Sequence, residues 1–111
     1  IIYEGAAVGD NGSGYARPLA AADPFLGFAF DTVDNSAGVA GAKRVKTRTE
    51  GMVELAVVGA TGVADIGELV YASDDDTFTL TSTSNSRIGR IIDHVSGTTC
   101  LVAYKAATLL D

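Results

Sequence analysis

The chain has 111 residues, which is enough for a single domain with one modest hydrophobic core. Its formal net charge of −6 at pH 7 argues against nonspecific binding to nucleic acid or to an anionic membrane, because such binding needs a basic surface. No apolar run approaches the roughly 20 residues that span a bilayer. Composition therefore predicts neither a nucleic-acid partner nor a membrane partner.

The residue types favour strands and turns over helices. The chain contains 13 glycines and many threonines and serines, which are typical of short strands and the turns between them. Its hydrophobic share of 47% is largely alanine and valine, and tryptophan is absent, so we expect a thin and tightly packed core.

The first 14 residues are predicted to form a flexible or extended N-terminal arm, with residues 15–111 as a single β-rich domain. A short apolar start is followed by the glycine-rich run 5–14, which has few side chains to pack. Within it, Asn11-Gly12 is read as a turn rather than as part of a glycosylation sequon. The chain begins at Ile1 rather than at methionine, and a removed leader and a late start both remain open.

The next two segments read as strands. Residues 15–19 form a short strand that Pro18 stops, and residues 25–33 form the most hydrophobic stretch of the first half. Period-two alternation in the second segment places Leu26, Phe28 and Phe30 on one face, which we interpret as a core face.

Residues 42–50 alternate again and carry half of the basic residues of the chain. Arg44, Lys46 and Arg48 share one face with Glu50, while Val45 lies on the other face. One interpretation is a solvated face whose charges protect a sheet edge from aggregation. The other is a polar contact with an acidic partner or with a neighbouring subunit.

The second half of the chain is predicted to be mostly strands. Residues 52–58 form a strand and residues 63–67 a single helical turn. The stretch 65–95 then reads as three strands at 69–72, 77–81 and 87–95, the last with Ile88, Arg90 and Ile92 on one face. A final strand covers residues 98–106. These elements predict an all-β fold, a small antiparallel β-sandwich or barrel of about seven or eight short strands.

No group of residues points to catalysis, a cofactor or a metal. The three carboxylates Asp74 to Asp76 lack the alternate spacing and the glycine of a calcium loop, so we interpret them as a hairpin tip. His94 is the only histidine, and Cys100 reads as a buried strand residue. We therefore expect a protein that is not an enzyme and that holds no cofactor.

The order and spacing of several segments resemble the small capsid cement, or head decoration, proteins of tailed bacteriophages. The resemblance covers about residues 15–104 and is carried by YARP at 15–18, FLGFA at 25–29, VDNSAG at 33–38, GAKRV at 41–45, TEG at 49–51, DIG at 65–67, VYASDD at 70–75 and RIGRI at 87–91.

The resemblance implies a structural protein that binds the major capsid protein on the outer surface of the expanded head and reinforces it, commonly as a homotrimer. An extended N-terminal segment can add a strand to a capsid subunit, so one interpretation places Ile1, Ile2 and Tyr3 in a capsid-contacting arm, and the other is a frayed terminus. A trimer also needs a contact between its subunits, for which the face with Arg44, Lys46 and Arg48 is one candidate. Two other classes remain open. One is another virion or assembly component, such as a tail or head-fibre protein, and the other is a surface- or carbohydrate-binding β module.

Overall fold

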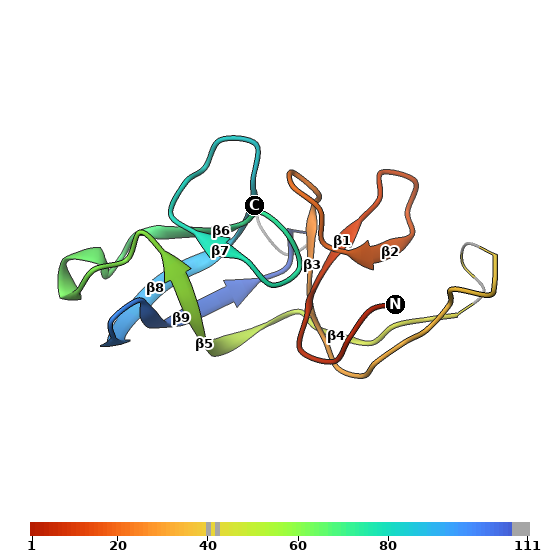
Figure 1. Ribbon diagram of the computed structural model, residues 1–111, viewed down its shortest axis with the longest axis horizontal. Coiled ribbons are helices and arrows are strands. Elements are labelled where there is room, and N and C mark those ends of the chain that lie inside the picture. Colours follow the sequence, from red (N-terminus) through yellow and green to blue (C-terminus); the bar gives the residue numbers. More distant parts are fainter. Residues whose placement is uncertain (40, 42, 108–111) are drawn as a thin grey trace.

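In the computed structural model, which describes residues 1–39, 41 and 43–107, the chain folds into two β-sheets that lie end to end (Figure 1). The molecule is elongated, with extents of 45 × 23 × 20 Å. One sheet has four strands, and the other closes into a five-stranded barrel. This confirms the predicted all-β fold and selects the barrel form.

The first sheet is built from the N-terminal half of the chain. Its strands are β1 (Ala7–Asp10), β2 (Ala16–Pro18), β3 (Phe25–Ala29) and β4 (Thr47–Arg48). They lie in the order β2-β1-β3-β4, and each neighbouring pair is antiparallel. The strands β2 and β4 are therefore the two edges of this sheet.

The barrel contains the remaining elements, which are β5 (Glu50–Val58), the 3-10 turn η1 (Val63–Asp65), β6 (Leu69–Ala72), β7 (Phe78–Thr79), β8 (Ser86–Ser96) and β9 (Thr99–Lys105). The order around the barrel is β5-β7-β6-β8-β9. Neighbouring strands are antiparallel except for β5 and β7, which run parallel. The described residues thus form nine strands, and the helical turn is confirmed at η1.

The N-terminal segment differs from the predicted arm because β1 lies inside the first sheet. Ala7 and Val8 are fully buried between β2 and β3. The glycine-rich run after β1 is ordered by its own side chains, since Asp10 Oδ1 accepts hydrogen bonds from the N–H groups of Gly12 and Gly14. Residues 1–14 therefore belong to the fold, and their glycines serve the turn between β1 and β2.

A β-bulge in β3 overturns the predicted core face of that strand. In the ladder with β1, Val8 pairs with Gly27 and Gly9 pairs with Phe25, so that Leu26 is an extra residue. The extra residue shifts the alternation, so that Phe25 and Phe28 both enter one core, while Phe30, which lies beyond the end of β3, stays 46% exposed. Gly27 makes the bulge possible, because its φ of +119° favours glycine and a Cβ there would overlap the Arg48 carbonyl oxygen.

Bulges also change the predicted face of β8. The register of its ladders with β6 and β9 shifts at three places, and Ile88 and Ile92 are among the bulged residues that have no partner in the shifted ladder. As a result Ile88 and Ile91 are buried, whereas Arg90 and Ile92 are exposed. The prediction that Ile88, Arg90 and Ile92 share a face is therefore wrong. Strands with bulges bend and twist more strongly, which helps this long strand to close the barrel.

An aromatic cluster joins the two sheets. Phe28 of the first sheet packs edge-on against Tyr104 of the barrel with 4.7 Å between ring centroids, and its ring centre lies 6.0 Å from that of Phe78. Phe25 lies 5.3 Å from Phe28 and 6.3 Å from Tyr104. These four rings belong to one hydrophobic core that contains residues of both sheets.

Replacement of Phe28 by alanine should destabilise the protein by about 3–5 kcal/mol, because it leaves a cavity at the junction of the sheets. The matched variant Phe30→Ala should cost less than about 1 kcal/mol, since this ring is half exposed and contacts Arg48. Urea unfolding of both variants measures the difference. Equal losses would contradict the role of Phe28 at the junction of the sheets.

Substitution of Gly27 by alanine should cost roughly 2–4 kcal/mol, through backbone strain and overlap with β4. Gly62→Ala is the control, because Gly62 has extended backbone and a Cβ there would meet nothing within 4 Å. Thermal unfolding should give a clearly lower melting temperature for Gly27→Ala than for Gly62→Ala. Equal melting temperatures would contradict the need for glycine at position 27.

Candidate functional site

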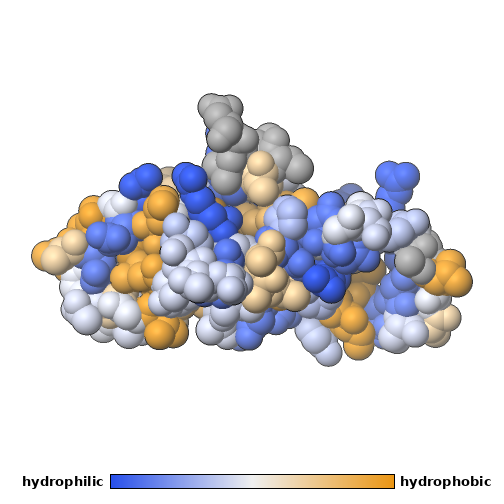
Figure 2. All heavy atoms as spheres, turned by 90° about the horizontal axis from the view of Figure 1, so that it is seen from above, coloured by the Kyte–Doolittle hydropathy of each residue, from blue (hydrophilic) through white to orange (hydrophobic). Residues whose placement is uncertain are grey.

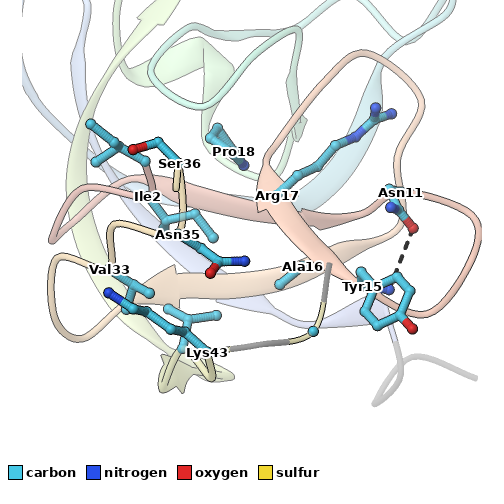
Figure 3. A pocket seen from close by; sticks show the side chains of 13 residues that line it. Ile2, Asn11, Tyr15, Ala16, Arg17, Pro18, Val33, Asn35, Ser36 and Lys43 are labelled. Atoms are coloured by element: carbon cyan, nitrogen blue, oxygen red, sulfur yellow. Dashed lines mark hydrogen bonds between the residues drawn. The ribbon is translucent and has the colours of Figure 1, made fainter. Parts of the chain in front are cut away.

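A pocket of about 270 Å³ opens at the N-terminal end of the first sheet, between the chain start, β2 and the stretch after β3. Figure 3 shows Ile2, Val33 and Lys43 on one side of it and Asn11 and Tyr15 on the other. The pocket therefore has apolar walls with polar groups at its margins.

The structure separates the three predicted capsid-contact residues. Ile2 is 8% exposed and forms a bridge to Val33, in which the N–H of each residue donates to the carbonyl oxygen of the other at 2.9 and 2.8 Å. Ile1 and Tyr3 are 49% and 58% exposed. Ile1 and Ile2 line the pocket, whereas Tyr3 borders a separate hollow beside Asp75. The bridge fixes the position of the chain start, and the capsid contact stays a prediction.

Hydrogen bonds hold the loop on the Lys43 side of the pocket. Lys43 Nζ donates to the Asp34 carbonyl oxygen at 2.6 Å, and Asn35 Nδ2 donates to the Val39 carbonyl oxygen at 2.9 Å. The Ser36 hydroxyl and N–H both donate to the Asp34 carboxylate, at 2.6 and 2.9 Å, and together with Lys43 they lower the pKa of Asp34. The polar side chains of this loop therefore hold its conformation through hydrogen bonds within the loop.

An ion pair fixes β2, which forms another wall of the pocket. Arg17 Nε and Nη2 donate to Asp23 Oδ2 and Oδ1 at 2.8 and 2.7 Å, and the Ala20 N–H donates to Asp23 Oδ2 at 3.0 Å. Asp23 is 8% exposed, and the hydrogen bonds from Arg17 are the main reason why its pKa is lowered. Sequence reasoning missed this pair, because six residues and a turn separate its members.

The three predicted subunit-contact residues lie on one exposed stretch that ends in β4. Arg44, Lys46 and Arg48 are exposed and alternate with the half-buried Val45 and Thr47, as predicted. The Arg48 guanidinium lies over the Phe30 ring, 4.3 Å from its centroid. The alternation is confirmed, and the subunit contact stays a prediction.

The predicted hairpin tip at Asp74 to Asp76 also joins the two sheets. The Asp75 carbonyl oxygen accepts a hydrogen bond from the Ala7 N–H at 2.9 Å, and Asp74 forms a bridge with Ala20. Asp74 Oδ1 accepts from the Asp76 N–H at 2.8 Å, which is the main reason why the pKa of Asp74 is lowered. The carboxylate of Asp74 is thus used in the turn itself.

Cys100 and His94, the two remaining candidate residues, both contact the fold around them. Cys100 is fully buried, which raises the pKa of its thiol, and His94 Nε2 lies 2.9 Å from the Gly97 carbonyl oxygen. Among the described residues, no three His, Cys, Asp or Glu side chains gather closely enough to hold a metal ion. Within the same residues, no helix is long and apolar enough to cross a membrane.

Comparison of the chain with known protein families, with curated proteins and with solved structures finds no match.

Acid should weaken the fold through Asp23. Because its pKa is lowered in the folded state, its contribution to stability is present above the unfolded value of about 3.9 and is lost as the pH falls through the folded value. Asp23→Asn should therefore lower stability at pH 7 and reduce the further loss between pH 4 and pH 2, as measured by urea unfolding. Asp31→Asn, at an exposed carboxylate, is the control and should behave as the unmodified protein does. Parallel acid curves for the Asp23 variant and the unmodified protein would contradict this role.

Proposed function

We propose that the chain is a non-enzymatic decoration protein, which binds the outer surface of an expanded phage head and stabilises it by bridging capsid subunits. The ordered resemblance over residues 15–104 suggests this function, and the shape of the molecule supports it. A bridging protein needs separate contact surfaces, and an elongated molecule of 45 × 23 × 20 Å can place them far apart.

The observation that carries the proposal is the exposure of large apolar side chains at both ends of the molecule, where Figure 2 shows hydrophobic atoms. At the end formed by the first sheet, Tyr15 and Val39 are 45% and 77% exposed. At the barrel end, the exposed residues are Val63, Ile66, Ile92 and Val95. Backbone hydrogen bonds between Gly67 and Ile91 and between Ile91 and Glu68 hold the segment after η1 alongside β8, which carries Ile92 and Val95.

Apolar side chains that cluster on an exposed surface mark interaction sites. In this proposal the N-terminal residues Ile1, Ile2 and Tyr3 contribute to the contact with the major capsid protein, and the protein acts as a homo-oligomer, with a trimer favoured by the resemblance. Each copy adds weak contacts to several neighbours, so that many copies together resist outward movement of a capsid subunit. The proposed location is the virion surface.

The decisive experiment mixes the purified protein with expanded heads that lack it, sediments the heads and counts the bound copies. The proposal predicts saturable binding at a fixed ratio to the major capsid protein and heads that resist heat better. Absence of binding to heads of the cognate phage would overturn it.

The double variant Ile1→Ser/Tyr3→Ser should weaken head binding about tenfold or more, because it removes two exposed apolar contacts. It leaves the buried Ile2 and its bridge to Val33 intact, and therefore the fold. Val58→Ser, which changes an exposed apolar residue on the barrel, is the control. Head binding that is equal in the two variants would remove the N-terminus from the capsid contact.

A further inference from the structure

A strip of charged side chains changes sign halfway along the molecule. It begins just before β4 and continues through β4 into β5, with only Thr49 between these two strands. The basic half consists of Arg44, Lys46 and Arg48, and the acidic half of Glu50 and Glu54 with the uncharged Met52 between them. Figure 1 shows this part of the chain as the yellow-green ribbon that passes from the first sheet into the barrel.

The six side chains occupy alternate positions from 44 to 54 and all of them are exposed. Between them Val45, Thr47 and Val53 are half-buried, as expected where successive side chains leave opposite faces, whereas Thr49 and Gly51 are exposed. The two halves meet at a groove of about 310 Å³, which Arg48 and Met52 both line together with Phe30. This groove connects the basic half of the strip with the acidic half.

The charges of the strip have no ion-pair partner within 4 Å among the described residues, where the one ion pair is Arg17–Asp23. Lys105 lies opposite Glu50 in the ladder between β5 and β9, but it does not approach to that distance. The stretch of β5 that carries Glu50 and Glu54 is also open on one side, because β5 pairs with β7 only at Val57 and Val58. A second chain can therefore reach both the charges and the free edge of the strand.

From this pattern we infer that the strip is the contact between copies of this chain, the basic half of one copy lying against the acidic half of its neighbour. When two strips cross in opposite directions about Thr49, Arg48 faces Glu50 and Arg44 faces Glu54 of the neighbouring copy. Met52, which is 66% exposed, then faces the stem of the neighbour's Lys46 and is covered by the contact. The crossing is a two-fold contact, because each copy gives both halves of its strip to the same neighbour, and it therefore joins two copies rather than the three that the resemblance favours. The inference deepens the proposed function by naming the acidic partner of the basic residues, and it rests on the protein of that function being a homo-oligomer.

The test reverses the charge of each half and then of both halves. Arg44→Glu/Lys46→Glu/Arg48→Glu and, separately, Glu50→Lys/Glu54→Lys should each weaken self-association by more than about 100-fold, because like charges then face one another. The variant that combines all five substitutions should associate again, since its strip is complementary in the opposite sense. Sedimentation of the purified proteins without heads, at low and high salt, measures the association, and salt should weaken it in the unmodified protein.

The matched control is Glu68→Lys/Asp76→Lys, which changes the net charge as the acidic-half variant does, at exposed carboxylates outside the strip. It should associate as the unmodified protein does, and thermal unfolding should show that every variant is folded. Failure of the folded five-substitution variant to associate, or an unmodified protein that stays monomeric, would overturn the inference. Because no heads are present, this outcome is independent of whether the protein binds them.

Discussion

The packing of Phe28 against Tyr104 is the contact on which the arrangement of the two sheets depends. Edge-to-face aromatic pairs add stability beyond the area that they bury, and the four rings of the junction come from β3, β7 and β9. Among the described residues, the Ala7 N–H donates to the Asp75 carbonyl oxygen between the sheets, and Ala20 forms a bridge with Asp74. The aromatic cluster therefore carries much of the coupling, and it sets the orientation of the chain start relative to the barrel.

Bulges decide which apolar side chains of two strands reach the core. The bulge at Leu26 lets Phe25 and Phe28 of one strand both reach it, whereas Phe30 lies beyond the end of β3 and is 46% exposed. In β8 the bulge after Ile91 has a comparable effect, since it buries Ile91 and leaves Ile92 39% exposed. Bulges thus bury some apolar side chains of these strands and leave a neighbour such as Ile92 at the surface.

Local patterns predicted much of the fold, and long-range contacts account for what they missed. The alternation in β6 and β9 identified both strands, and the charged strip alternates as expected, because these segments contain no bulge at the decisive positions. The bulges were not predictable, because they depend on strand pairing between distant parts of the chain. Gly27, for example, passes closely by the carbonyl oxygen of Arg48, and Gly89 by that of Ala103. The N-terminal arm was predicted from a glycine-rich composition. Composition does not reveal which distant strands pair with a segment, and here β2 and β3 bury β1.

The charge order of the strip also bears on solubility. An exposed sheet edge with free backbone groups invites open-ended pairing with other chains, and charged side chains on the edge are a common protection. Half of the chain's eight basic residues lie between positions 43 and 48, and acidic residues follow directly, so parallel stacking in register would place like charges together. Crossing in opposite directions brings unlike charges together instead. One pattern of side chains can therefore oppose aggregation in most orientations and allow association in one.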